Sequence, residues 1–284
     1  MWLPLRPYQV FLVAGIVLVM GASSFASTEK PVVVTYAPDT LVAEERGPHI
    51  SARAYAIFDA STGRILAAQE MDEALPIASV TKLFTAAAVL GSEEVDTEYT
   101  VRDVDVASHG RAGRLSAGET YTAHELLFPL LLESSNDAAA VLERETKGEI
   151  VSQINEYAKE QGASTFNVTD ASGLSDNNVA SAEDLATLTS VLYRTMPHVF
   201  DMTQFSKRVG PYVTWTNNSP VRGGSYRGGK HGFTSAANRT LVAIFDESFD
   251  ESTKAVGYVI LGSDDLALDT EVLRSFVREH VTLR

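Results

Sequence analysis

Segments typical of β-strands lie at both ends of this chain, and segments typical of helices fill its middle. The stretches "ARAYAIFDA" and "RILAAQE", joined by "STG", predict a β-hairpin. Towards the other end, "SKRVGPYVTW", "GGKHGFT", "RTLVAIFDE" and "KAVGYVILG" are also rich in β-formers. Strands at the two ends are buried most economically in one shared layer. We therefore expect an α/β (α+β) fold, with an antiparallel sheet of about five strands from the first hairpin and the last three strands.

The middle of the chain predicts a helical subdomain that packs on this sheet. The run "LFTAAAVL" is apolar on nearly every side, which predicts a buried helix. Two helices broken near Ser134 are expected next, and Thr122 with Glu125 forms a capping-box pattern at the first of them. Further amphipathic helices are expected in "IVSQINEYAKEQG", "SAEDLATLTSVLYRT" and the closing "LDTEVLRSFVREHV".

The N-terminal end of the chain predicts export. Residues 10–20, "VFLVAGIVLVM", are apolar, follow Arg6 and precede the small-residue stretch "GASSFAS". We expect residues 1–26 to be a signal peptide or an uncleaved membrane anchor, the one segment expected to contact a membrane. Either way, the rest lies in the periplasm or on the extracytoplasmic face of the cell membrane. Residues 27–50 are expected to be a linker, and residues 51–284 the folded domain.

Composition argues against several classes of function. The formal net charge of −14 repels phosphate backbones, so no nucleic-acid partner is expected. The chain contains no cysteine, which excludes disulfides, thiol nucleophiles and cysteine-ligated metal sites.

A serine and a lysine lie three residues apart, at Ser79 and Lys82, where the buried helix begins. Residues i and i+3 share a helix face, so the two side chains lie side by side. A serine hydroxyl needs a base before it can act as a nucleophile. Burial and a nearby like charge, here Lys230, lower the pKa of a lysine enough to make it that base. The structural alternative is that Ser79 caps the helix and Lys82 reaches along its surface to solvent.

A second motif, Ser134-x-Asn136, interrupts the helical region at "LLESSNDAAAVL". The Ser134 hydroxyl could relay a proton between Lys82 and a leaving amine. The Asn136 amide could bind a backbone group of a substrate. The alternative is an ordinary helix boundary, because serine and asparagine both favour caps.

A third motif, Lys230-His231-Gly232, lies on an expected strand. A glycine at 232 allows a ligand to approach the backbone closely, and an exposed strand edge can pair with an extended peptide. The N–H groups of Phe233 and Ser79 would then form an oxyanion hole. The alternative is an ordinary edge lysine that protects the sheet from aggregation.

With all three motifs in this order, the chain resembles the penicillin-binding proteins and serine β-lactamases. It is most similar to the low-molecular-mass D-alanyl-D-alanine carboxypeptidases, peptidase family S11, from about Ser51 to Arg284. The similar stretches are "AIFDASTGRILAAQEMDEALPIASVTKLFTA", "GRLSAGETYTAHELLFPLLLESSNDAAAVL" and "FNVTDASGLSDNNVASAEDLATLT".

The resemblance implies a β-lactamase/transpeptidase-like fold and a mechanism. Lys82 deprotonates Ser79, which attacks the penultimate D-Ala carbonyl of a peptidoglycan stem peptide. The terminal D-Ala leaves with the help of Ser134, and water hydrolyses the acyl-enzyme. Lys230 and Thr234 would hold the terminal carboxylate of the substrate. β-Lactams would acylate Ser79 as mimics of the dipeptide, and no metal or organic cofactor is implied.

Two features depart from the family pattern. The middle residue of the third motif is usually threonine, and here it is His231. Its imidazole could donate a hydrogen bond in place of the hydroxyl, with a pH dependence near its own pKa, or it could simply be tolerated. Thr234 keeps one hydroxyl nearby. Many relatives also carry a C-terminal β-rich domain and an amphipathic anchor, whereas this chain ends after its last helix.

Three other functions are compatible with parts of the pattern. A DD-endopeptidase that cuts peptidoglycan cross-links uses the same chemistry on a larger leaving group, and the sequence does not separate it from a carboxypeptidase. A class A β-lactamase needs a glutamate that activates the deacylating water, and the corresponding residues 164–178 contain none. A non-catalytic cell-wall-binding module would explain His231 but not the intact Ser79, Lys82 and Lys230.

Overall fold

The computed structural model describes residues 40–43, 46–107, 110, 113–250 and 252–284. The expected signal peptide or anchor, residues 1–26, lies outside the described residues. Among those described, the helices are η1 (Ala78–Val80), α1 (Thr81–Leu90), η2 (Asp105–Ala107), α2 (Ala123–Leu132), α3 (Asn136–Glu145), α4 (Glu149–Glu160), α5 (Ala182–Thr195), α6 (His198–Gln204) and α7 (Leu266–His280). The strands are β1 (Leu41–Ala43), β2 (Ala54–Asp59), β3 (Ile65–Gln69), β4 (Leu75–Pro76), β5 (Glu98–Thr100), β6 (Thr120–Thr122), β7 (Val179–Ala180), β8 (Lys207–Val209), β9 (Thr214–Thr216), β10 (Tyr226–Thr234), β11 (Asn238–Phe249), β12 (Ser252–Ser263) and β13 (Val281–Leu283).

Five of the strands form one antiparallel sheet in the order β10-β11-β12-β2-β3. The first hairpin of the chain therefore lies beside the last three long strands, as the sequence predicted. β10, which carries the third motif, is the terminal strand of this sheet.

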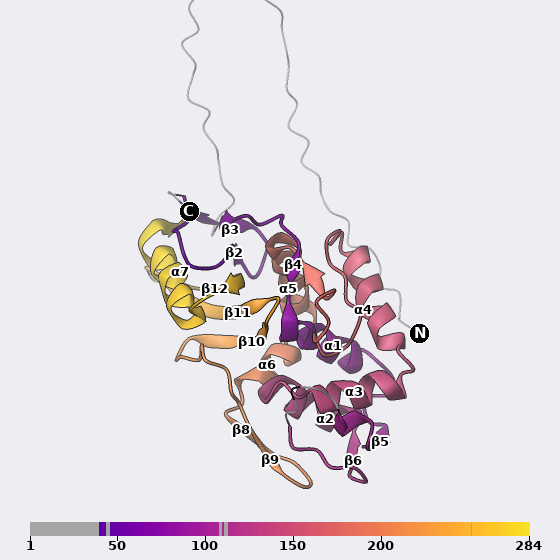
Figure 1. Ribbon diagram of the computed structural model, residues 1–284. Helices are drawn as coiled ribbons and strands as arrows, with labels where there is room; N and C mark the ends of the chain where they lie inside the picture. Colours follow the sequence, from indigo (N-terminus) through magenta and orange to yellow (C-terminus); the bar gives the residue numbers. More distant parts are fainter. Residues whose placement is uncertain (1–39, 44–45, 108–109, 111–112, 251) are drawn as a thin grey trace, which may run out of the picture.

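Helices cover both faces of the sheet, α7 on one side and the helical subdomain on the other (Figure 1). Side chains alternate between the two faces along each strand. On β11, Leu241 joins the cluster under α7, whereas Val242 joins the larger cluster on the helical side. All six residues of β2 are buried, because both of its faces are covered.

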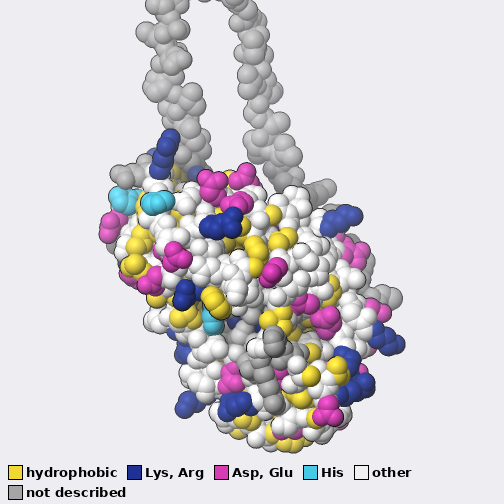
Figure 2. Space-filling model, in the orientation of Figure 1, with side chains coloured by type: hydrophobic (Ala, Val, Ile, Leu, Met, Phe, Trp, Pro, Cys, Tyr) yellow, Lys and Arg dark blue, Asp and Glu magenta, His cyan; other side chains and the backbone are white. Residues whose placement is uncertain are grey.

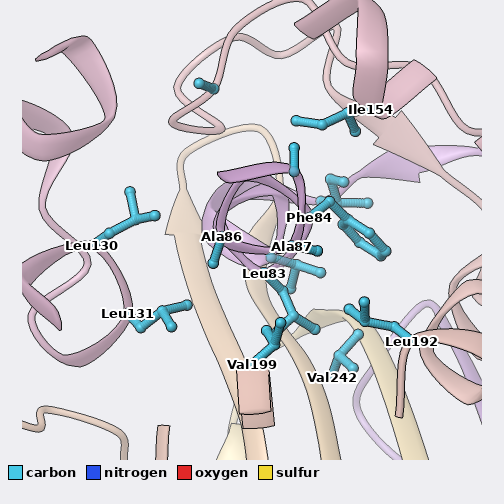
Figure 3. Packing of buried hydrophobic residues seen from close by; sticks show 14 of the residues in the cluster. Leu83, Phe84, Ala86, Ala87, Leu130, Leu131, Ile154, Leu192, Val199 and Val242 are labelled. Atoms are coloured by element: carbon cyan, nitrogen blue, oxygen red, sulfur yellow. The ribbon is translucent and has the colours of Figure 1, made fainter. Parts of the chain in front are cut away.

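Helix α1 lies at the centre of the larger cluster and is surrounded by other elements. Figure 3 shows Leu83 and Phe84 of α1 among side chains that include Leu131 of α2, Ile154 of α4 and Leu192 of α5. Nine of its ten residues are buried, which agrees with a sequence that is apolar on nearly every side. A charged residue on this helix is therefore enclosed unless it reaches a cleft.

The expected helix boundaries are confirmed by side-chain caps. Thr122 and Glu125 form a reciprocal capping box at the start of α2. Ser181 caps α5 by accepting a hydrogen bond from the Asp184 N–H at 3.1 Å.

The structure differs from the expectations in two places. The region after Pro197 was expected to be β-rich, but it begins with helix α6, which packs beside β10, and β8 pairs with β9 in a hairpin outside the main sheet. The expected linker contributes β1, which pairs with β13, and Leu41 is fully buried there. The linker boundary at residue 50 is therefore wrong, because a three-residue strand is too short to show a periodic pattern.

Acidic and basic side chains are interspersed on the face shown in Figure 2. Among the residues that the structure describes, no helix is both long enough and apolar enough to span a membrane.

Candidate active site

Ser79 lies in η1, the short helical turn that precedes α1, and is half-buried. It does not cap α1, because the N-cap position is Val80 and no side chain caps this helix. The preceding residue, Ala78, has a left-handed φ of 49°, an uncommon conformation for a residue with a Cβ. Such strain often occurs at functional sites. The Thr240 hydroxyl of β11 donates to the Ile77 carbonyl at 2.9 Å, which ties this turn to the sheet.

Lys82 lies in the first turn of α1, and its exposed fraction is 0%. Its Nζ atom is 3.0 Å from the Ser79 hydroxyl, 2.8 Å from the Asn136 side-chain carbonyl and 2.5 Å from the Ser172 backbone carbonyl. Two of these three partners can only accept hydrogen bonds, whereas the hydroxyl can donate or accept. A neutral amine that donates to both carbonyls therefore directs its lone pair at the Ser79 hydroxyl.

Burial lowers the pKa of Lys82 to about 7, although the negative charge of Asp170 acts in the opposite direction. A substantial fraction of the side chain is therefore a neutral amine near neutral pH. The reading of Lys82 as a surface lysine that reaches solvent is excluded.

The corner between α2 and α3 brings Asn136 to Lys82. Ser135, and not Ser134 or Asn136, caps α3 by accepting a hydrogen bond from Ala138 N–H at 3.0 Å. The Asn136 Nδ2 atom donates to the Gly110 carbonyl at 2.9 Å. Asn136 is thus held by the protein on both sides of its amide.

Ser134 lies at this corner with a left-handed φ of 61° and is half-buried. Among the described residues, no hydrogen bond joins its hydroxyl to Lys82 or Lys230. The structure therefore brings Ser134 to the same corner as Asn136 without forming the expected relay.

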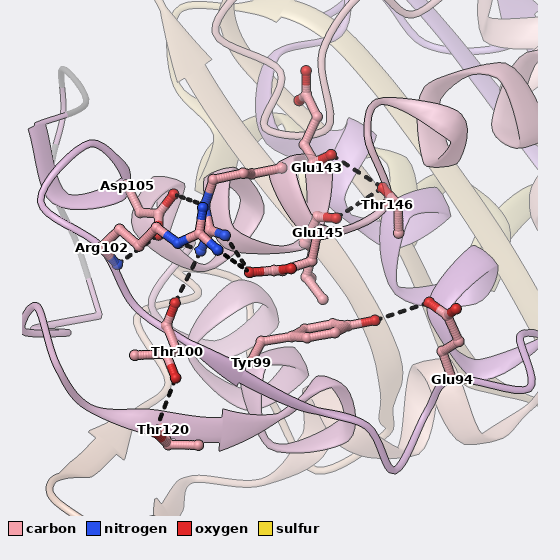
Figure 4. A network of polar contacts seen from close by, with 11 residues as sticks. Glu94, Tyr99, Thr100, Arg102, Asp105, Thr120, Glu143, Glu145 and Thr146 are labelled. Atoms are coloured by element: carbon pink, nitrogen blue, oxygen red, sulfur yellow. Dashed lines mark hydrogen bonds and ion pairs between the residues drawn. The ribbon is translucent and has the colours of Figure 1, made fainter.

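The far end of α3 is anchored by a polar network (Figure 4). The Arg144 guanidinium donates to both carboxylate oxygens of Asp105 at 2.8 Å and to the Thr100 carbonyl at 2.9 Å. Asp105 is 2% exposed, so this ion pair is largely shielded from solvent. The network ties η2 and β5 to the helix that positions Asn136.

The third motif faces Ser79 from β10. Lys230 lies directly opposite Val242 and therefore points to the helical side of the sheet. It is 2% exposed, and its Nζ atom donates to the His231 carbonyl at 2.6 Å. Burial, together with repulsion from Lys82, lowers the pKa of Lys230 well below its ordinary value. The two lysines are thus close enough for their positive charges to repel each other.

Gly232 of β10 lies against the backbone of the nucleophile. A Cβ atom at this position would lie 2.6 Å from the Ser79 backbone nitrogen and 2.8 Å from the Thr240 hydroxyl. A side chain would not fit there, so the glycine is required by space. The expected approach of a ligand to Gly232 stays a prediction, and the close neighbour in the structure is the Ser79 backbone.

A comparison with known families matches residues 41–264 to peptidase S11, D-alanyl-D-alanine carboxypeptidase. The chain belongs to this family.

Curated relatives in this family carry two different names. A D-alanyl-D-alanine endopeptidase from Haemophilus influenzae is 32% identical over 143 residues, which is 48% of this chain and 49% of that protein. The D-alanyl-D-alanine carboxypeptidase DacB2 from Mycobacterium tuberculosis is 27% identical over 209 residues, 69% of this chain and 70% of that protein. The matched region thus spans about half the length of the first relative.

Solved structures share the β-lactamase-like fold of the penicillin-binding proteins. A penicillin-binding protein homologue from Mycobacterium tuberculosis superposes with a TM-score of 0.75 at 22% identity, over 81% of this chain and 92% of that one. Penicillin-binding protein D2 from Listeria monocytogenes, solved in its cefotaxime-bound form, gives a TM-score of 0.71 at 26% identity, over 81% and 98%.

This member of the S11 family departs from the expectation at His231. The residue lies opposite Leu241, on the other face of β10 from Lys230. Burial, with repulsion from Lys230 and Lys82, lowers the pKa of His231 to about 3. This shift favours the neutral imidazole, so a pH dependence from His231 is expected well below its ordinary range.

Phe233 and Thr234 lie at the end of β10. The Phe233 side chain is 63% exposed, with the Arg239 guanidinium 5.8 Å from its ring centroid. Gly229 N–H points out of the sheet, because it donates to the Thr203 hydroxyl of α6. Alternate N–H groups share an edge, so the Phe233 N–H also points outward.

The Thr234 hydroxyl accepts from Ala237 N–H at 3.1 Å, which stabilises the turn to β11.

Sequence reasoning missed the loop that supplies the third partner of Lys82. Ser172 contributes a backbone carbonyl, and a carbonyl leaves no signature in the residue type. The sequence feature that could have indicated this loop is Gly173, the residue after Ser172, which has a left-handed φ of 82°. A Cβ atom on Gly173 would lie 2.0 Å from the Ala78 carbonyl oxygen, so a glycine is needed where the loop packs on the nucleophile turn.

A groove opens beside this site. It has a volume of about 470 Å³, and Asn136 and Ser172, both partners of Lys82, form part of its wall. Val104 and Leu174 contribute exposed apolar surface to the same groove. The groove is open to solvent and adjoins the residues that hold Lys82.

Proposed function

We propose that this chain is a serine-type D-Ala-D-Ala carboxypeptidase that removes the terminal D-Ala from peptidoglycan stem peptides. The observation that carries this proposal is the contact between a half-buried serine hydroxyl and a fully buried lysine amine, Ser79 and Lys82, at 3.0 Å. A nucleophile and base in hydrogen-bond contact, with the base oriented by further groups, are typical of covalent acyl transfer.

The acylation step begins with proton transfer. The lone pair of Lys82 takes the proton of the Ser79 hydroxyl, and the serine oxygen forms a bond to the carbonyl carbon of the penultimate D-Ala. The resulting oxyanion would accept hydrogen bonds from the N–H groups of Ser79 and Phe233. Removing one such donor in other enzymes costs about 10²–10³-fold in rate.

The tetrahedral intermediate then collapses. The C–N bond breaks, the terminal D-Ala leaves, and its nitrogen receives a proton from Lys82 through the Ser134 hydroxyl. Water attacks the acyl-enzyme ester, the C–O bond to Ser79 breaks, and the serine regains its proton. Ser134 would have to rotate towards Lys82 to serve as this relay, because the structure shows no such hydrogen bond among the described residues.

The charge of the site favours a substrate that ends in a carboxylate. Lys230 lies buried beside Lys82, and a bound carboxylate would stabilise the protonated form of either amine. Thr234, on the same face of β10, and neutral His231 at the sheet edge are the further groups proposed to contact this carboxylate. Asn136, which lines the groove, is the residue proposed to contact the peptide backbone of the substrate, and the groove lined by Leu174 would hold the rest of the stem peptide.

The peptidoglycan substrate also requires the chain to be exported. We propose that residues 1–26 direct it to the periplasm or the outer face of the cell membrane, where β-lactams would reach the same serine. The cefotaxime-bound form of the Listeria relative supports β-lactams as ligands of this site.

Endopeptidase activity on cross-linked peptides is the second candidate. The endopeptidase from Haemophilus influenzae is the more similar of the two relatives per aligned residue, at 32% identity. The acyl donor would be the same, and the leaving group would be the side-chain amine of a second stem peptide.

A labelling experiment tests the proposal. The purified protein is incubated with a fluorescent penicillin, and the adduct is located by mass analysis of a digest. We expect a stable adduct on Ser79 that is lost in Ser79→Ala and retained in Ser116→Ala, a control at an exposed serine. Rapid turnover of the penicillin would indicate a β-lactamase, and no adduct would indicate a binding module.

A second measurement separates the two peptidase activities. The protein is incubated with a purified pentapeptide stem and with a cross-linked dimer, and the products are identified by mass. Release of free D-Ala from the pentapeptide supports the carboxypeptidase, whereas cleavage of the dimer alone supports the endopeptidase.

A further inference from the structure

The loop of residues 170–175, "DASGLS", is built around one carboxylate. Asp170 Oδ1 accepts hydrogen bonds from the Ser172 N–H at 2.7 Å, the Ser172 hydroxyl at 2.6 Å and the Gly173 N–H at 2.7 Å. Asp170 Oδ2 accepts from the Ser175 N–H at 2.8 Å. An aspartate that binds the N–H groups of the residues after it fixes a turn locally. The path of this loop therefore depends on Asp170.

The same loop is fastened to the helices that carry the site. The Thr85 hydroxyl of α1 donates to the Ala171 carbonyl at 2.8 Å, and the Ala171 N–H donates to Glu143 of α3 at 2.8 Å. Asn178 Nδ2 donates to the Asp170 carbonyl at 2.9 Å. The loop thus has a fixed position relative to both Lys82 and Asn136.

The Ser172 carbonyl is the point at which this loop touches the base. It accepts a hydrogen bond from Lys82 Nζ at 2.5 Å. An amine has one lone pair, and its direction is set once two N–H groups are committed to fixed acceptors. The Ser172 carbonyl is one of these two acceptors, so a displacement of the loop would turn the lone pair away from Ser79.

We propose that Asp170 is a positioning residue for the general base: by fixing the Ser172 carbonyl, it aims the Lys82 amine at the Ser79 hydroxyl. The inference rests on the proposed function, because it takes Lys82 to be the base. Asp170 binds the loop and does not touch Ser79, so its effect passes through Ser172 and Lys82.

The charge of Asp170 gives this role a second consequence. Burial alone would raise the pKa of Asp170, but the hydrogen bonds from Ser172, Ser175 and Gly173 hold it below the ordinary value, so the carboxylate is ionised. That negative charge raises the pKa of Lys82 against the effect of burial. Among the residues that the structure describes, the other titratable groups that face Lys82 are Lys230 and His231 of β10.

Asp170→Asn tests the proposal, with Asp176→Asn as a matched control at an exposed aspartate directly after this loop. The second-order rate constant of acylation by a fluorescent penicillin is measured from pH 5 to 9. Asp170→Asn should move the acid limb of the profile to lower pH by roughly half to one unit, because a charge that favours the ammonium is lost. The plateau should fall roughly 10-fold, because the amine is less well aimed. Asp176→Asn should match the wild type.

The plateau reports how well the amine is aimed, whereas the acid limb reports the lost charge of Asp170. A lower plateau with an unchanged thermal melt supports the proposal. An unchanged plateau would overturn it, whether or not the acid limb moves. If Asp170→Asn fails to fold, Asp170→Ser carries the same readout, because its hydroxyl can still accept a turn hydrogen bond. Absence of labelling in the wild type would instead overturn the proposed function.

Discussion

Lys82 and Ser79 are joined by a 3.0 Å contact in which the lysine is fully enclosed and the serine is only half-buried. The two residues therefore differ in what can reach them. A substrate can approach the hydroxyl, whereas water is excluded from the amine that would activate it. Desolvation keeps part of the amine population neutral, so the burial of α1 is itself a requirement of the proposed chemistry.

The rate of acylation should rise with pH through neutrality. The pKa of Lys82 is about 7, and only the neutral amine can accept the serine proton. We expect the rate constant of penicillin acylation to rise about tenfold per unit below pH 6 and to level off above pH 8. A stopped-flow fluorescence assay across this range measures it. A profile that is flat from pH 6 to 8 would mean that a different group is the base.

The same burial makes stability depend on pH. The pKa of Lys82 is about 7 in the folded chain and near 10.5 when unfolded, so between these values the unfolded chain binds the extra proton. The free energy of unfolding therefore rises with pH in this window, by up to about 1.4 kcal/mol per unit for this group. Lys82→Met should show a smaller rise than the wild type in urea titrations at pH 7 to 10, because the buried Lys230 still contributes to it. Lys207→Met, at an exposed lysine, should retain it.

Much of the architecture could be predicted because local signals agreed with the global fold. The capping box of Thr122 and Glu125 and the Ser181 cap predicted helix starts that the structure confirms. The strand-rich ends predicted the shared sheet, because only pairing between them buries both sets of apolar residues. Helix α6 was missed, since seven residues contain fewer than two full turns of periodic pattern.

The chemistry of individual residues was harder to predict where it depends on tertiary packing. The residue type at position 231 does not predict that its side chain is buried near two lysines, and the low pKa of His231 follows from that packing. The Ser172 carbonyl is a backbone group, and its role depends on where the Asp170 loop lies in space. In contrast, Ser79, Lys82 and Asn136 could be predicted to meet, because each is a residue type whose chemistry fits the site.

Adding a methyl group at Gly232 should block acylation. The Cβ atom of Gly232→Ala would lie 2.6 Å from the Ser79 nitrogen, one of the two proposed oxyanion donors. We expect the acylation rate to fall by about 10²–10³-fold. Gly224→Ala is the control, because its Cβ atom would meet nothing within 4 Å. Thermal melts of both variants check the fold, and a fully active Gly232→Ala would exclude this oxyanion site.

Restoring threonine at position 231 should improve recognition of the substrate carboxylate. The pKa of His231 is lowered to about 3, so its imidazole adds no charge to the site and carries a single N–H on a planar ring. A threonine hydroxyl is smaller and rotates freely, so it can turn its O–H to the carboxylate where the ring cannot. One added hydrogen bond of ordinary strength lowers KM by about 2- to 10-fold. We expect His231→Thr to lower KM for a peptide that ends in free D-Ala, with kcat and the acid limb nearly unchanged.

The matched substrate is the same peptide with its terminal carboxylate converted to an amide. The KM for this amide should change little in His231→Thr, because the added hydroxyl no longer meets a charged acceptor. Steady-state kinetics on the two peptides therefore separate carboxylate binding from a general change in the strand. An equal decrease in KM for the acid and the amide would show that residue 231 acts through the position of β10 and not through the carboxylate.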